Sequence, residues 1–117
     1  MDQAVAFLVA DEQARVLLTS MVSCLFARKV YTPELLQECL ATLGYTALAD
    51  NLDGLARSIQ QKRWQLRLAT GFKPAQVKIP QRFREVTTWK GQTDPQYLDA
   101  LVSSYASAIE SLAKTQA

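Results

Sequence analysis

Hydrophobic positions recur with a helical period along most of the chain, and no segment alternates apolar and polar residues as a half-buried strand would. The first predicted helix begins near Asp2, continues or restarts at Asp11, and ends near Ala27. Apolar side chains cover most of its circumference and leave only a narrow polar strip, formed by Glu12, Arg15, Thr19 and Ser23. A helix with this pattern is expected to be central and enclosed.

A second helix is predicted to start at Thr32-Pro33, because threonine can cap a helix and proline fits its first position. Gly44 is placed to end this helix after about ten residues, in the left-handed conformation. The apolar stripe expected to face the core consists of Leu36, Cys39, Leu40 and Leu43.

A third helix is expected from Asp50 or Asn51 to Thr70, with Gly71 as its terminator. Its apolar face consists of Leu52, Leu55, Ile59 and Leu66. A last amphipathic helix is predicted to follow the start signal Thr93-Asp94-Pro95, with apolar positions from Tyr97 to Leu112.

The segment 72–94 contains two prolines and a glycine and shows no sustained period, so we predict one long ordered loop. It is expected to hold at most one short helical turn near residues 81–85. The side chains expected to pin it are Phe72, Ile79, Phe83 and Trp89.

These elements indicate an all-α fold, an irregular bundle of about four to five helices. The chain has 117 residues, 49% hydrophobic and 21% charged, which suits a single domain over residues 1–117. No apolar run is long enough to span a bilayer, and the start Met1-Asp2-Gln3 lacks the basic region of a secretory signal. We therefore expect a cytoplasmic protein without a membrane partner.

The amino-acid composition excludes most of the common sets of catalytic residues. Histidine is absent, which excludes Ser-His-Asp and Cys-His mechanisms and HExxH metal sites. The four glycines are isolated, so no phosphate-binding loop is present, and carboxylates occur near helix starts rather than in pairs suited to acid–base catalysis. No residue is assigned a catalytic role, and the isolated chain is not expected to turn over a substrate.

Charge is distributed unevenly around a small net value of +2. Residues 54–90 carry nine basic side chains and one acidic, whereas both flanking segments are acidic. A solvated helix face is the ordinary interpretation of such a block. A second is a free-standing interaction module whose basic face, Arg57, Lys62, Arg63 and Arg67, binds an acidic protein. Nucleic-acid binding ranks third, because a pI near 8.6 is below a strongly basic footprint, and we expect no nucleic-acid partner.

Two cysteines, Cys24 and Cys39, lack CxxC spacing and are expected to be reduced thiols. From spacing alone, the favoured interpretation of each is a buried side chain in a helix core, because free cysteine is among the most buried residue types. Cys39 fits that interpretation best because it lies on the apolar stripe of its helix.

Three stretches in order resemble the C-terminal helical domain of the aldehyde:ferredoxin oxidoreductases, the tungstopterin and iron–sulfur enzymes. They are Cys24-Leu25-Phe26-Ala27-Arg28 with Val30-Tyr31-Thr32, the helix end closing in Gly71-Phe72, and Ile79-Pro80-Gln81-Arg82-Phe83. Together they span roughly residues 15–85. This chain has Thr19 where the family often has aspartate, and Ala69-Thr70 where it often has Arg-Glu.

The resemblance implies that Cys24 is one cysteine ligand of a [4Fe–4S] cluster whose other three ligands belong to the preceding domains of the parent oxidoreductase. It also implies that Ser23 lies where the backbone approaches the tungstopterin. Such an enzyme oxidises an aldehyde to a carboxylic acid and passes the electrons to ferredoxin. The isolated chain is expected to hold neither cofactor.

Overall fold

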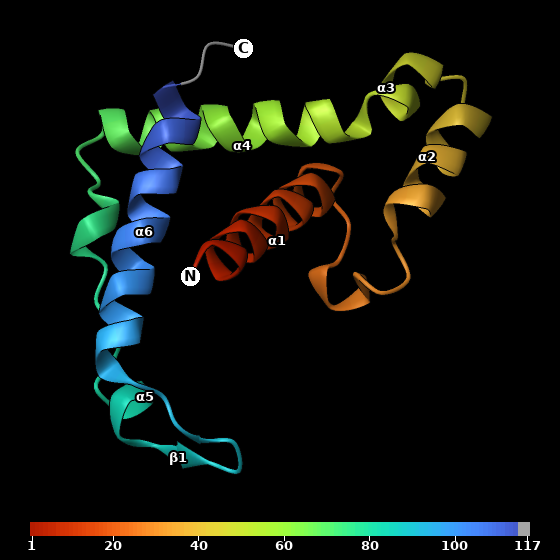
Figure 1. Cartoon of the computed structure of the whole chain (residues 1–117). Helices are drawn as coiled ribbons and strands as arrows, with labels where there is room; N and C mark the ends of the chain where they lie inside the picture. The colour runs from red at the N-terminus through yellow and green to blue at the C-terminus, as the bar shows by residue number, and fades with distance from the viewer. Residues whose placement is uncertain (115–117) are drawn as a thin grey trace. The chain divides into compact units, whose positions relative to one another are not determined.

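The computed structural model describes residues 1–114 and confirms the all-α fold class, with 72% helix. Its α-helices in chain order are α1 Asp2–Ser20, α2 Pro33–Thr42, α3 Thr46–Asp50, α4 Leu52–Ala69, α5 Arg82–Glu85 and α6 Pro95–Lys114 (Figure 1). Two short 3-10 helices, η1 Leu25–Ala27 and η2 Pro74–Gln76, and a minimal hairpin of β1 Thr87–Thr88 and β2 Gly91–Gln92 complete the described part of the chain. None of the described helices combines the length and apolarity needed to cross a bilayer.

The chain divides into two compact units. The central unit comprises residues 10–63, and the C-terminal unit comprises residues 1–9 together with the described residues from Trp64 onward. Helices α1 and α4 each contribute residues to both units. The expectation of a single domain over residues 1–117 stays a prediction.

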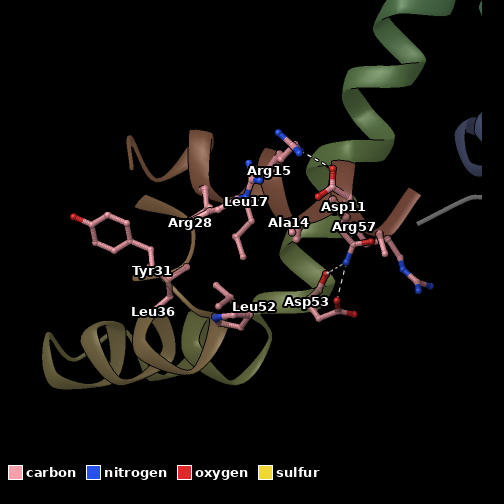
Figure 2. Close-up of a pocket in the computed structure, with 15 residues that line it drawn as sticks. Asp11, Ala14, Arg15, Leu17, Arg28, Tyr31, Leu36, Leu52, Asp53 and Arg57 are labelled. Carbon is pink, nitrogen blue, oxygen red and sulfur yellow. Dashed lines mark hydrogen bonds and ion pairs between the residues drawn. The ribbon is translucent and has the colours of Figure 1, made fainter. Parts of the chain in front are cut away.

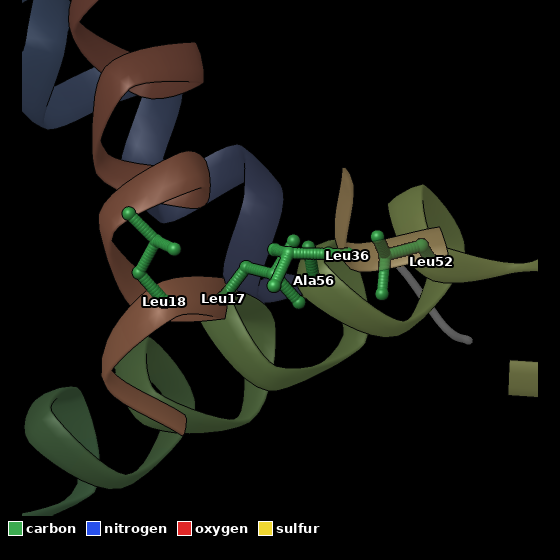
Figure 3. Packing of buried hydrophobic residues seen from close by; sticks show 5 residues of the cluster. All are labelled: Leu17, Leu18, Leu36, Leu52 and Ala56. Carbon is green, nitrogen blue, oxygen red and sulfur yellow. The ribbon is translucent and has the colours of Figure 1, made fainter. Parts of the chain in front are cut away.

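The core of the central unit is an aliphatic cluster from α1, α2 and α4 (Figure 3). Its buried members are Leu17, Leu18, Leu36, Leu52 and Ala56, with Met21, Leu25 and Leu40 packed around them. Helices α2 and α3 also contact each other. Burial of each leucine side chain of this cluster contributes about 1.5–3 kcal/mol. This burial is the main force that holds α1, α2 and α4 together in the central unit.

The C-terminal unit has its own core, centred on Ile109 of α6, whose side chain is fully buried. Trp64 of α4 and Ala113 pack against it. The Gln65 side-chain amide donates to the Ala113 carbonyl at 2.9 Å, which adds a polar contact between α4 and α6. The 3-10 helix η2 also packs against α6. Arg84 of α5 forms an ion pair with Asp99 of α6 at 2.5 Å.

Most helix boundaries that capping chemistry predicts are confirmed. The Thr32 hydroxyl accepts the Leu35 N–H at 3.3 Å at the start of α2, and the Asp94 carboxylate accepts the Gln96 N–H at 2.9 Å at the start of α6. Gly44 and Gly71 adopt positive φ values of 85° and 88° where α2 and α4 end. The short helical turn expected near residues 81–85 is α5.

The first helix is shorter than predicted, because it ends at Ser20 rather than near Ala27. The Ser23 N–H bonds to the Leu18 carbonyl at 2.9 Å, and the Val22 N–H bonds to the Thr19 carbonyl at 3.2 Å. These two bonds form a Schellman motif, which requires a left-handed residue between them. Val22 takes that position with φ 58°, the only positive φ among the described non-glycine residues.

Several side chains expected in the core are exposed. The first helix is not enclosed, since Phe7 is 67% exposed, and on the stripe of α2 Cys39 and Leu43 face solvent. In the segment 72–94, Phe83 and Trp89 are 64% and 91% exposed, so they do not pin the chain. Leu66 of α4 is exposed as well, while Gln60 and Gln61 are buried in its place. The five-residue helix α3 was not predicted.

Candidate functional site

Cys24 lies beyond the end of α1, in the turn that leads into η1. Its backbone is extended, with φ −70° and ψ 123°, and its carbonyl accepts the Ala27 N–H at 3.0 Å. The thiol is exposed. The interpretation of Cys24 as a buried helix-core residue is therefore wrong, because the helix stops before it and the chain turns its side chain outward.

Three apolar side chains around Cys24 are largely exposed. Val22 is 93% exposed, Phe26 is fully exposed and Val30 is 63% exposed. Ser23 is half-buried and held by its bond to Leu18. Soluble proteins seldom leave several such side chains in one short segment in water unless another surface covers them. We call residues 22–30 the cysteine segment.

Over residues 1–114, the structure gathers no group of three or more cysteine, aspartate or glutamate side chains able to hold an ion. An iron–sulfur cluster requires four protein ligands, as a rule thiolates. The exposed Cys24 thiol fits one corner of such a centre, and the remaining ligands would have to come from another domain or chain.

The predicted basic face lies on α4. Arg57, Lys62 and Arg63 belong to the central unit and are exposed, and no acidic side chain of the described residues forms an ion pair with them. Arg67 belongs to the C-terminal unit, where its guanidinium lies 5.1 Å from the Trp64 ring centre and 5.0 Å from that of Phe72. Arg67 therefore serves partly to cover an aromatic pair.

A cavity of about 460 Å³ opens in the central unit between α1, α2 and the start of α4 (Figure 2). Its floor is the aliphatic cluster of Figure 3. In Figure 2, Leu17, Leu36 and Leu52 point toward the middle of the cavity, and Arg28 stands beside Leu17. Sequence spacing gave no sign of this cavity, because its walls come from segments as far apart in the chain as Ala10 and Arg57.

Charged side chains line the rim of this cavity. Arg15 pairs with Asp11 at 2.6 Å within α1, and the Gln13 amide donates to the Asp53 carboxylate at 2.7 Å, which links α1 to α4. Arg28 and Arg57 also line the cavity, and neither forms an ion pair with any residue in the range 1–114. Three guanidinium groups thus face two carboxylates, an excess of one positive charge.

Comparison with known proteins identified no relative of this chain. No family model, curated protein or solved structure matches this chain. The resemblance to the aldehyde:ferredoxin oxidoreductases therefore depends on the three sequence stretches alone, and the cofactor roles of Ser23 and Cys24 stay predictions.

Proposed function

We propose that this chain is the C-terminal helical domain of a tungsten-dependent aldehyde:ferredoxin oxidoreductase, in which Cys24 supplies one thiolate to a [4Fe–4S] cluster. The observation that carries the proposal is the exposed Cys24 thiol, which stands directly after a strained helix end. A thiol sealed in the core could not reach a centre completed by another domain.

The backbone at Val22 supports a functional role for the cysteine segment. A β-branched residue in the left-handed region is unfavourable, and such strain is concentrated at functional sites. Here the strain sets the direction in which the chain leaves α1 and so the position of Cys24 two residues later. Exposed Phe26 and Val30 give the segment an apolar surface that a preceding domain would cover.

The division of ligands follows from the cysteine count. The chain has two cysteines, and Cys39 lies on α2, in a different element from Cys24. Three further thiolates would come from the preceding domains of the parent enzyme. Electrons from the oxidation of an aldehyde to a carboxylic acid would leave the tungstopterin through such a cluster to ferredoxin, and Ser23 would contribute backbone near the pterin.

Cysteine replacement in the whole enzyme tests this proposal. The chain is expressed with the coding sequence that precedes it, and the two variants Cys24→Ala and Cys39→Ala are compared. We expect Cys24→Ala to lose the electron paramagnetic resonance signal of the reduced [4Fe–4S] cluster and part of the bound iron. Cys39→Ala, which removes the other exposed thiol, should retain both. A complete cluster in Cys24→Ala, or the lack of any cysteine-rich domain upstream, would refute the ligand role.

A second candidate function is a free-standing module that binds an acidic protein through the basic side chains of α4. The exposure of Arg57, Lys62 and Arg63 without ion-pair partners in the described part of the chain favours it. Association should weaken with ionic strength, because exposed charges are screened. The variant Lys62→Gln/Arg63→Gln should lose affinity, and capture of no protein at low salt would count against this function.

A further inference from the structure

We propose that the cavity of the central unit binds a small amphipathic carboxylate, with its apolar body on the leucine floor and its carboxylate at Arg28. A volume of about 460 Å³ is within the range of small-molecule sites, which is about 300–1,000 Å³. Occupancy of this cavity requires no cluster at Cys24, so either proposal can fail without the other.

The floor determines the apolar part of the ligand. Five buried aliphatic side chains form it, each less than 8% exposed: Leu17, Leu18, Leu36, Leu52 and Ala56. They present no polar atom that could hold a sugar or a base. A hydrocarbon chain placed there removes its own surface from water at no cost in lost hydrogen bonds.

The rim determines the charge of the ligand. The charge of Arg15 is already neutralised by Asp11, and Asp53 is held by Gln13. Arg28 has no acidic partner among residues 1–114 and stands beside Leu17, whereas the Arg57 side chain points away from the labelled leucines (Figure 2). Arg28 is therefore the unpaired cation that stands beside a floor leucine, and its planar guanidinium matches a carboxylate with two parallel hydrogen bonds.

The same rim disfavours more highly charged ligands. Asp11 and Asp53 lie on it, and the three arginines exceed these two carboxylates by a single positive charge. A phosphate ester carrying close to two negative charges would exceed that single positive charge. A singly charged carboxylate balances the rim.

Arg28 is held in place by its backbone. It caps η1, and its N–H donates to the Leu25 carbonyl at 3.3 Å. Leu25 in turn packs against the core cluster. The side chain that would bind the carboxylate is thus attached to the same cluster that forms the floor.

Binding of octanoate to the 117-residue chain, followed by calorimetry and by amide chemical shifts at low salt, tests the proposal. Octan-1-ol is the matched neutral ligand. We expect saturable binding of one octanoate per chain, with weaker binding of octanol. Arg28→Gln should weaken octanoate binding about tenfold, since charged hydrogen bonds contribute about 1.5–3 kcal/mol. Lys29→Gln, which removes a neighbouring charge that does not line the cavity, should change it less than about twofold.

A second variant tests the cavity itself. Ala14 lines the cavity from an exposed position of α1, so Ala14→Leu should fill space without disturbing the core, and leucine favours helix. We expect octanoate affinity to fall about fivefold or more, which corresponds to about 1 kcal/mol of binding free energy. The circular dichroism spectrum should be unchanged. The proposal is overturned if octanoate does not saturate, if octanol binds as tightly, or if Arg28→Gln and Lys29→Gln behave alike. A dimer in sedimentation that Ala14→Leu dissociates would assign the cavity to a second copy of the chain instead.

Discussion

Val22 holds a left-handed backbone although its side chain is branched at Cβ and 93% exposed. Two other helices of this chain end in the same hydrogen-bond pattern with glycine at the equivalent position, Gly44 and Gly71. Glycine has no Cβ atom and adopts the left-handed conformation without steric strain, whereas the Cβ of valine makes that conformation unfavourable. At the scale of single residues, the chain therefore has an energetically unfavourable backbone conformation at Val22, two residues before Cys24.

Replacement of Val22 by glycine should stabilise the protein. The left-handed conformation costs an L-residue about 1–2 kcal/mol, and the greater freedom of glycine in the unfolded chain returns part of that gain. We expect the free energy of unfolding in urea to rise by about 0.5–1 kcal/mol.

Val30→Gly is the matched control, because Val30 is also exposed but has no positive φ. It should leave stability unchanged or lower it. A Val22→Gly variant less stable than the parent would show that the valine side chain makes a contact that offsets its backbone strain.

Thr32 contributes to the start of α2 through its side chain. Thr32→Ala removes the acceptor of the Leu35 N–H and should lower the free energy of unfolding by about 1 kcal/mol. Thr32→Ser keeps the hydroxyl and should recover most of the loss in the same urea titration. The pKa of Glu34 is lowered by its own backbone N–H and by the Thr32 hydroxyl, so Thr32→Ala should raise that pKa. An unchanged Glu34 titration by NMR would contradict this account.

At the scale of elements, polar side chains link short segments to a longer helix. In the C-terminal unit, α5 has four residues and could not persist alone, because isolated helices of this length do not form in water. Arg84 of α5 donates two hydrogen bonds to the Asp99 carboxylate of α6. Gln92 of β2 donates to the Arg84 carbonyl at 2.7 Å. Arg84 thus joins α5, the hairpin and α6.

The Arg84–Asp99 pair should make stability dependent on pH on the acid side. Hydrogen bonds from Arg84 lower the pKa of Asp99 below its ordinary value of 3.8. A carboxylate with a lowered pKa stabilises the fold above its unfolded-state pKa and loses that contribution as pH falls through the folded-state pKa. The stability difference between the parent and Asp99→Asn should therefore be constant from about pH 7 to pH 5 and shrink below pH 4.

Glu110→Gln, on the same helix but outside this pair, is the control. Glu110→Gln should change the free energy of unfolding less than Asp99→Asn does, because in the described chain no ion pair involves Glu110. A difference for Asp99→Asn that persists unchanged to pH 2 would show that the charge of Asp99 is not what stabilises α5.

At the scale of the whole molecule, the described residues form two hydrophobic clusters of buried side chains. One is aliphatic and lies in the central unit, and the other gathers Trp64, Ile109 and Ala113 in the C-terminal unit. The hairpin tip, by contrast, places Trp89 in solvent beside Lys90, whose ammonium lies 4.9 Å from the ring centre.

The two tryptophans should report these environments separately. Trp89→Phe leaves Trp64, which is 6% exposed, so its emission should be blue-shifted and resist quenching by acrylamide. The parent protein should show an additional red-shifted, readily quenched component from Trp89. Unfolding in urea should make the emission and the acrylamide quenching of the two tryptophans alike. Equal quenching of the parent and Trp89→Phe would contradict the burial of Trp64 and with it the core around Ile109.

Local chemistry was sufficient to predict most of the long helices from the sequence, but not α3. Caps at Thr32 and Asp94 and terminators at Gly44 and Gly71 act through neighbouring backbone groups, so their spacing predicts where α2, α4 and α6 begin or end. The early end of α1 was missed because valine is not expected in a left-handed position. For the candidate site, the sequence singled out Cys24 but gave the wrong environment.

What the sequence alone determined is the fold class and most helix boundaries. What only the tertiary structure decided is exposure: that Cys24 and Cys39 face solvent, that Trp64 is buried while Trp89 is not, and that a cavity opens beside Arg28. The physical reason is range. Capping and helical periodicity depend on residues within about one turn, whereas burial depends on which distant segments meet, and apolar spacing along one helix does not specify its partners.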